Sequence, residues 1–272
     1  MSSNKKVRWI KPNSFVCGDF HKTMLRIQPE SIDCIFTSPP YNVGKKYDSS
    51  NDSKEYEKYL LFLNDAWKLS RKVLKPDGRL IINVPSITYK GYYQPLYADI
   101  INQCRKLGYV MRSDIVWYKQ AMSKRTAWGS WMSPSSPYVI QPYEFILVFQ
   151  KDINHYKHIG EKKNIDITRD EFILFSDGFW NIKAETLLSK VHPAPFPFDL
   201  AYRIIKFYIY KNDIVLDMFG GTGTVALACS KTGRNFIYND ISKKYCKYAK
   251  QRIKNGIVLG SSIFKGCENV KF

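Results

Sequence analysis

The sequence predicts an α/β protein built on a doubly wound, mostly parallel sheet. Apolar runs of strand length and rich in β-branched residues recur along the chain, at 32–36, 79–84 and 214–217. Stretches with helical spacing of apolar residues, such as 56–74, lie between them. Strands that alternate with helices favour a parallel sheet covered on both faces. A length of 272 residues suits one large α/β domain with a small inserted region.

The composition narrows the classes of partner. Lys and Arg number 42 against 24 Asp and Glu, a net charge of +18 that favours a polyanion, either nucleic acid or an anionic membrane surface. No apolar run is long enough to span a bilayer, and the N-terminus lacks the apolar stretch of a signal peptide. The six cysteines form no Cys-x-x-Cys pair, which indicates reduced thiols in a cytosolic protein. His155 and His158 lack an acidic or Cys companion at ligand spacing, so we expect a solvated loop there and no metal.

The first chemically informative stretch follows the strand predicted at 32–36. A short strand at 14–17, ending at Gly18-Asp19, precedes it, and Thr37-Ser38-Pro39-Pro40-Tyr41-Asn42 comes directly after it. The two prolines lack an N–H and fix φ, so they stop both a ladder and a helix. The result is a stiff corner at the carboxyl end of a strand, where open α/β sheets bind ligands. Taken alone, Pro-Pro-Tyr also suits a surface turn.

The middle of the chain predicts further elements. Residues 43–54 are rich in Gly, Ser, Asn, Asp and Lys, which predicts a mobile loop beside the corner that acts as a lid. After the helix at 56–74, Pro76-Asp77-Gly78 predicts a turn before the strand at 79–84. The pattern then predicts a helix and two strands, at 96–107, 109–118 and 143–150.

Two less regular segments follow. Residues 125–134 carry two tryptophans in a Gly/Ser/Pro-rich loop, which either cover a pocket or meet a planar ligand. Residues 151–190 show weak periodicity and mixed charges, and are the best candidate for a small inserted module. Asp199 is then expected to cap a helix.

The last third contains a strand, a glycine turn and a helix. The strand at 214–217 leads into Gly220-Gly221-Thr222-Gly223-Thr224, an arrangement that sets backbone N–H groups and a helix N-terminus against a nucleotide-like ligand. A second strand ends in Asp240, at the spacing of about 20 residues typical of a ribose-binding carboxylate. In the helix that follows, lysines are expected to face solvent, with Ile241, Tyr245, Ala249 and Ile253 facing inward.

Together these motifs resemble the amino-group DNA methyltransferases that use S-adenosylmethionine. Residues 37–42 are similar to that family's catalytic Ser/Asp/Asn-Pro-Pro-Tyr motif, and 217–224 to its Phe-x-Gly-x-Gly cofactor loop. Residues 15–19, 192–197 and 125–134 are similar to further family motifs. The catalytic motif precedes the cofactor motif, as in the family's permuted β group. The resemblance implies a Rossmann-like methyltransferase fold in a single domain spanning 1–272, in which the strands ending at Thr37 and Asp217 are neighbours. Its parts are a catalytic half at about 14–120, a cofactor half at about 191–260 and a target-recognition insertion at about 121–190.

The resemblance also implies the site residues. The residues that match the catalytic motif are Ser38, Pro39, Pro40 and Tyr41. Those expected to bind the cofactor are Asp19, Asp217, Phe219, Gly221, Gly223, Thr224, Asp240, His192 and Pro193. Those expected to contact DNA are Asn42, Arg125, Trp128 and Trp131. Asp217 would hold the methionine ammonium, Phe219 would pack on the cofactor, Asp240 would bind ribose and Asp19 the adenine amine.

The chemistry of an exocyclic amine explains the residue types of the corner. The lone pair of such an amine is delocalised into the ring, so two acceptors, Ser38 Oγ and the Pro39 carbonyl, would localise it by holding both N–H bonds. Tyr41 offers a face for stacking, worth roughly 1–3 kcal/mol per base. A base inside a duplex must be flipped out to reach such a corner.

Ser38 favours cytosine N4 as the methylated atom, since Ser is typical of the family's cytosine-N4 enzymes and Asp of its adenine-N6 enzymes. The alternatives are an adenine-N6 enzyme and a catalytically idle DNA-binding protein on the same scaffold; RNA also suits the charge. The expected setting is the cytoplasm of a bacterial or archaeal cell, with double-stranded DNA as partner. A cognate restriction endonuclease would share the system, no membrane would be involved, and the protein would be a monomer or homodimer.

Overall fold

The computed structural model describes residues 8–42, 46–47, 50–51, 55–85, 87–89, 92–120, 129–155 and 157–263. The helices are α1 (Phe20–Met24), α2 (Tyr56–Val73), α3 (Leu96–Lys106), α4 (Arg169–Phe175), α5 (Phe198–Tyr208), α6 (Thr224–Thr232) and α7 (Lys243–Asn255), with 3₁₀ turns η1 (Ile153–His155) and η2 (Lys162–Asn164). The main-sheet strands are β1 (Ser14–Cys17), β2 (Ile32–Thr37), β5 (Leu74–Val84), β8 (Val110–Tyr118), β9 (Tyr143–Gln150), β10 (Phe179–Asn181), β11 (Ile214–Asp217) and β12 (Asn235–Asp240). Two small ribbons pair β3 (Lys46–Tyr47) with β4 (Ser50–Asn51) and β6 (Ile87–Tyr89) with β7 (Tyr92–Gln94).

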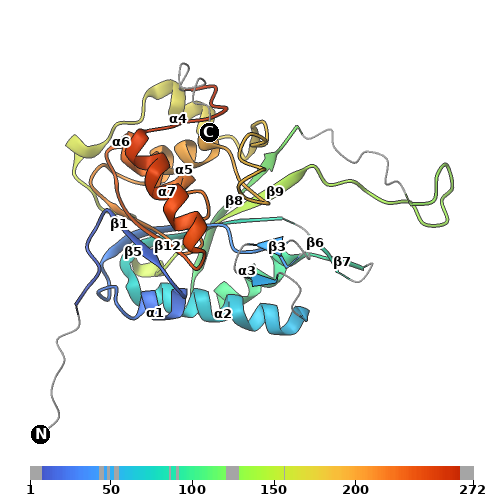
Figure 1. Ribbon diagram of the computed structural model, residues 1–272, viewed down its shortest axis with the longest axis horizontal. Helices are drawn as coiled ribbons and strands as arrows, with labels where there is room; N and C mark the ends of the chain where they lie inside the picture. The colour runs from blue at the N-terminus through green and yellow to red at the C-terminus, as the bar shows by residue number, and fades with distance from the viewer. Residues whose placement is uncertain are drawn as a thin grey trace, which may run out of the picture.

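One eight-stranded sheet organises the chain, in the order β1-β12-β11-β2-β5-β9-β8-β10. Its neighbouring strands pair in parallel, except that β9 runs antiparallel to both β5 and β8. Figure 1 shows α1, α2 and α3 below this sheet and α5, α6 and α7 above it. The expected doubly wound, mostly parallel α/β fold is therefore confirmed.

The apolar residues of the central strands feed two cores, one on each face. Along β2, Cys34 and Phe36 pack with α5 and α6, while Ile35 between them packs with α1, α2 and α3. Successive side chains of a strand point to opposite faces, and a sheet covered by helices on both sides buries both sets. This is why the strand reads as a continuous apolar run.

Strand β5 begins at Leu74, immediately after α2, so the turn expected at Pro76-Asp77-Gly78 falls within the bounds of the strand. Ile32 pairs with Leu74 and Cys34 with Arg79, so residues 75–78 of β5 lie opposite Asp33 alone and are paired in the ladder with neither β2 nor β9. Regular pairing of β5 with both neighbours begins at Arg79, where the sequence predicts the strand to begin.

The capping role expected for Asp199 is also wrong. Pro197 occupies the N-cap of α5, and Asp199 lies in the first turn. Its carboxylate accepts hydrogen bonds from Ser261 and Ser262, including one from Ser262 N at 2.8 Å. The buried acid therefore ties a distant segment of chain to α5.

The helix after β12 begins at Lys243, so Ile241, expected on its inward face, lies outside it. Ser242 caps α7 by accepting a hydrogen bond from Tyr245 N at 3.1 Å. Ile241 precedes the cap and is 53% exposed, so it does not belong to the inward face. Tyr245 and Ala249 are buried as expected, and the lysines of α7 are exposed.

The 121–190 range does not form a unit separate from the main sheet. Its strand β9 lies between β5 and β8, and its strand β10 pairs with β8 at the sheet edge. Residues 129–142 belong to a long loop that projects from the body of the molecule (Figure 1). Target recognition by this range stays a prediction, as do the domain boundaries. The lid expected at 43–54 lies outside the described residues, apart from the short strands β3 and β4.

Candidate active site

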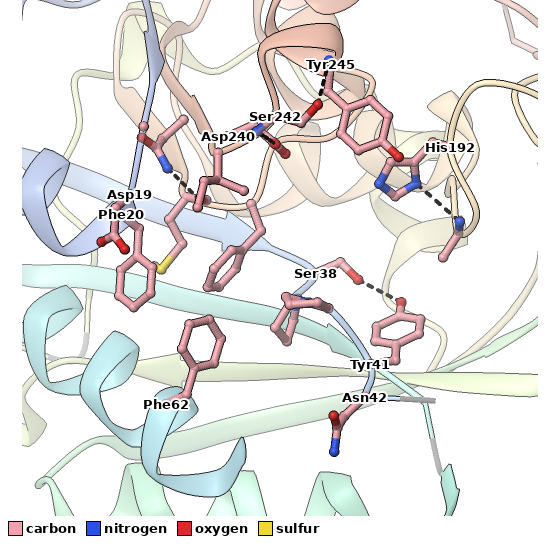
Figure 2. A pocket seen from close by; sticks show the side chains of 18 of the residues that line it. Asp19, Phe20, Ser38, Tyr41, Asn42, Phe62, His192, Asp240, Ser242 and Tyr245 are labelled. Carbon is pink, nitrogen blue, oxygen red and sulfur yellow. Dashed lines mark hydrogen bonds between the residues drawn. The ribbon is translucent and has the colours of Figure 1, made fainter. Parts of the chain in front are cut away.

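A cavity of about 400 Å³ lies at the carboxyl ends of β1, β2, β11 and β12 (Figure 2). Such a volume is typical of a site for a small molecule. It brings together residues expected from both halves of the chain, and the predicted residues in its wall are Asp19, Ser38, Pro39, Pro40, Tyr41, Asn42, His192, Phe219 and Asp240. Asp217, Gly221, Gly223, Thr224 and Pro193 lie outside that wall.

Direct pairing of β2 with β11 creates this juxtaposition. Cys34 pairs with Val215 and Ile35 with Leu216, so the Pro-Pro-Tyr corner and the glycine turn begin side by side. The Thr37 hydroxyl donates a hydrogen bond of 2.7 Å to Asp217 Oδ1 and joins the two strand ends. The expectation that these strands are neighbours is confirmed.

The glycine turn packs closely against neighbouring residues beneath the cavity. Gly223 has φ +78° and caps α6, and a Cβ there would lie 2.8 Å from the Ala249 Cβ. Gly221 has φ +48°, and a Cβ there would lie 3.1 Å from His192 Nε2. The buried Arg252 donates to Thr224 Oγ1 at 3.0 Å, and burial lowers the pKa of Arg252 to about 10. These residues hold the turn in place rather than face the cavity.

Two carboxylates of the cavity wall are held by backbone amides. Asp240 accepts from Gly221 N and from Ser242 N, each at 2.8 Å. Asp19 caps α1 by accepting from His21 N at 2.7 Å. Ionised carboxylates only accept hydrogen bonds, so these two acids suit a ligand that presents hydroxyl and amino donors.

An aromatic cluster lies beside these acids. Phe219 packs against Phe20 and Phe62, with ring centroids 5.3 and 5.9 Å apart, and all three rings line the cavity. Aromatic faces suit a flat heterocycle. Sequence reasoning missed Phe20 and Phe62. Phe20 adjoins Asp19, a signal that was present, whereas Phe62 reaches the site only through the packing of α2.

The Ser38–Tyr41 corner is part of a buried polar network. Ser38 Oγ lies 2.7 Å from the Tyr41 hydroxyl, and that hydroxyl donates to Glu144 Oε2 at 3.0 Å (Figure 2 shows the first contact). Asn83 Nδ2 donates to Glu144 Oε2 at 2.6 Å, and Lys119 Nζ lies 2.7 Å from Glu144 Oε1. Sequence reasoning missed Asn83, Glu144 and Lys119. Each stands on a predicted strand or directly after one, but only strand pairing places it at the corner.

Tyr41 and its neighbours are more enclosed than a free stacking platform. The Tyr41 side chain is 7% exposed, and the Tyr59 hydroxyl donates to the Pro40 carbonyl at 2.6 Å. Asn42 is buried with φ +56°, a conformation that Asn tolerates better than most residues. The whole corner is therefore rigidly held before any base arrives.

Asp217 lies at the junction of the two motifs. It is 3% exposed, and Phe219 N donates to its carboxylate at 3.2 Å. Burial raises the pKa of Asp217 to about 7, against an ordinary aspartate value of 3.8. Contact between Asp217 and a methionine ammonium stays a prediction.

The residues expected to contact DNA are less fully described. Arg125 and Trp128 lie outside the described residues, and Trp131 is 65% exposed on the projecting loop. Asn42 alone of this group stands in the cavity wall. Their roles stay predictions.

The solvated loop expected around the His-x-x-His pair is wrong for His158. His158 is 8% exposed, and its two ring nitrogens lie 3.1 Å from Asp77 Oδ2 and 2.7 Å from Asp213 Oδ2. Asp33, His158 and Asp213 offer ligand atoms within 4.8 Å of one another, but Lys75 pairs with Asp33. His158 is therefore held between two carboxylates, and Asp33 pairs with Lys75, at the end of the sheet opposite the cavity.

The fold and the site together define a class of methyl-transferring enzymes, and comparisons with known proteins agree. A family model described as DNA methylase matches residues 32–251. The chain is 43% identical over 178 residues to the type II methyltransferase M.MjaVI of Methanocaldococcus jannaschii, covering 65% of this chain and 90% of that protein. It is 26% identical to the DNA adenine methyltransferase YhdJ of Escherichia coli, over 88% of this chain and 82% of YhdJ.

A solved structure shares the fold over nearly the whole chain. TTHA0409 of Thermus thermophilus, in complex with S-adenosyl-L-methionine, superposes with a TM-score of 0.73 at 27% identity, covering 95% of this chain and 99% of that one. The protein belongs to the N6/N4 amino-group DNA methyltransferase family. Among the helices within the described ranges, none combines the length and apolar character needed to cross a membrane.

Proposed function

We propose that the protein transfers a methyl group from S-adenosylmethionine to the exocyclic N4 amine of a flipped-out cytosine in duplex DNA. The observation that carries this proposal is the shared cavity, which sets the Ser38 corner and the Asp19–Asp240 pair in one wall. The net charge of +18 suits the DNA backbone as partner.

The cavity suits the cofactor in three ways. Asp240 would accept from ribose hydroxyls, Asp19 from the adenine amine, and the Phe20–Phe62–Phe219 cluster would pack on apolar parts of the molecule. When bound, S-adenosylmethionine supplies an electrophilic methyl group. Cofactor-bound TTHA0409, which shares the fold, supports this choice.

The corner provides the acceptors that the target amine needs. Ser38 Oγ and the Pro39 carbonyl would each take one N–H bond of the amine, which localises the nitrogen lone pair toward the methyl donor. Pro40 has no N–H to compete for those electrons, and the Tyr59 bond to the Pro40 carbonyl fixes the corner. A preorganised acceptor needs no rearrangement as the nitrogen becomes tetrahedral.

Ser38 supports cytosine as the target base, because the first motif position carries a neutral hydroxyl rather than the Asp carboxylate typical of the family's adenine-N6 enzymes. Adenine N6 is the second candidate, and the similarity to YhdJ, whose name specifies adenine, favours it. A catalytically idle DNA-binding protein is disfavoured by the intact corner, which keeps its polar network beside an open cavity.

The likeness to M.MjaVI, a type II methyltransferase, supports a role in restriction–modification. In that role the enzyme would protect host DNA from a cognate endonuclease. Target recognition would fall to Asn42 and to the 121–190 range, in which Trp131 is exposed.

Mass analysis of nucleosides tests the proposal. DNA of mixed sequence is incubated with the protein and methyl-labelled cofactor, then digested to nucleosides. We expect label in N4-methylcytosine. Label in N6-methyladenine would show that the target base is adenine rather than cytosine. Cofactor binding without any labelled nucleoside would support the catalytically idle alternative.

A further inference from the structure

Glu144 on β9 stands behind the catalytic corner rather than in the cavity wall. We propose that Glu144 is a positioning residue that sets the polarity of the Ser38 hydroxyl through Tyr41, so that Ser38 meets the target amine as a hydrogen-bond acceptor. This inference rests on the proposed function and assigns one further residue to it.

The contacts of Glu144 identify it as the fixed end of the network. The residue is 6% exposed, and its Oε1 forms an ion pair with Lys119 Nζ at 2.7 Å. Oε2 accepts from Tyr41 at 3.0 Å and from Asn83 at 2.6 Å. An ionised carboxylate can only accept, so the Tyr41 proton must point toward Glu144.

The direction of that proton decides the next bond. With its own proton given to Glu144, the Tyr41 oxygen offers lone pairs to Ser38, 2.7 Å away. Ser38 has a second acceptor for its single proton, the backbone carbonyl of Asn83 at 3.2 Å. Both choices use the Ser38 proton inside the protein. One lone pair of Ser38 Oγ faces Asn83 Nδ2, 3.5 Å away, and the other is left for a donor in the cavity, which is what an amine is.

Removing the negative charge of Glu144 would reverse the direction of the hydrogen bonds that run from Ser38 through Tyr41 to Glu144. Glutamine offers one carbonyl oxygen and one NH₂ group, and Lys119 carries only donors, so Lys119 claims the oxygen. The NH₂ group then faces Tyr41 and donates to its oxygen. The Tyr41 proton turns to Ser38 and occupies a lone pair that the amine requires. Shape is nearly preserved, while the polarity at Ser38 is inverted.

Single-turnover methyl transfer on saturating duplex DNA is the test. We expect Glu144→Gln to slow the transfer about 10- to 100-fold, the loss typical of a charge-assisted hydrogen bond. Calorimetric affinity for S-adenosylmethionine should stay at the wild-type value. Glu171→Gln is the matched control, because the Glu171 carboxylate also accepts from a tyrosine, Tyr202, at 2.6 Å, outside the cavity wall. It should keep the wild-type rate.

A double-mutant cycle separates positioning from a general structural role. The influence of Glu144 passes through the Tyr41 hydroxyl, so Glu144→Gln added to Tyr41→Phe should cost less than about threefold further. Glu144→Asp keeps the charge and should transfer faster than Glu144→Gln. If Glu144→Gln does not fold, the same cycle with Glu144→Asp applies, and its loss should vanish beside Tyr41→Phe.

Two outcomes would overturn the inference. One is a wild-type rate for Glu144→Gln, and the other is an equal loss with and without the Tyr41 hydroxyl. Failure of the proposed function is distinguishable from both, because the wild-type protein would then label no nucleoside at all.

Discussion

The buried Asp217 couples stability to pH in a direction unusual for an aspartate. We consider Asp217→Asn, which keeps an oxygen to accept from Thr37 Oγ1 and Phe219 N but cannot ionise. In the wild type, burial raises the folded-state pKa of Asp217 to about 7 from an ordinary 3.8. The folded protein therefore retains a proton that the unfolded chain releases between these values.

This retained proton sets the direction in which the free energy of unfolding changes with pH. The contribution of Asp217 to stability is fully present below about pH 4 and is lost as the pH rises through about 7. At about 1.4 kcal/mol per pH unit, the interval corresponds to about 4 kcal/mol, an upper figure because local relaxation and water reduce such costs. Asp217→Asn carries no such loss, so its advantage in unfolding free energy should grow toward neutral pH and then level off.

Urea unfolding of the cofactor-free protein at several values between about pH 5 and about pH 8 measures this difference. Other titrating groups are common to both proteins and cancel in the comparison. Asp114→Asn on β8 is the control, since it makes the same chemical change at an exposed aspartate away from the buried Thr37–Asp217 contact. A flat difference for Asp217→Asn over the same range would refute the reasoning. If Asp217 meets the methionine ammonium, adding S-adenosylmethionine should narrow the gap.

Two further predictions concern the corner and the glycine turn. Ser38→Ala should lower kcat about 10²–10³-fold while leaving calorimetric cofactor affinity intact, because Ser38 belongs to the base side of the cavity; a parallel loss of affinity would contradict this division. Gly223→Ala should destabilise the protein by roughly 2–4 kcal/mol, since φ is +78° and the added methyl would lie 2.8 Å from Ala249 Cβ. Thermal unfolding checks this against Gly178→Ala, where an added methyl meets no atom within 4 Å among the described residues.

Much of the fold and several residues of the cavity wall could be predicted from local patterns in the sequence. The apolar run of β2 and the Pro-Pro pair after it constrain the backbone within a few residues, so the strand and its stiff end are readable without the rest of the chain. The turn at Gly223 is equally local, because a left-handed residue before a helix favours glycine. These signals placed the Ser38 corner and Asp240 in one wall once β2 and β11 were expected to be neighbours.

What the tertiary structure decided is the surroundings of that corner. Glu144 meets Tyr41 across 103 positions of sequence because β9 runs antiparallel beside β5, with Val84 opposite Phe145. The start of regular pairing in β5 at Arg79, opposite Cys34 on one side and Gln150 on the other, likewise follows from contacts distant in sequence. Strand register is set by the packing of both cores at once, a long-range condition that no short window of sequence contains. The hydrogen-bond partners of Ser38 and Tyr41 are therefore a property of the folded sheet.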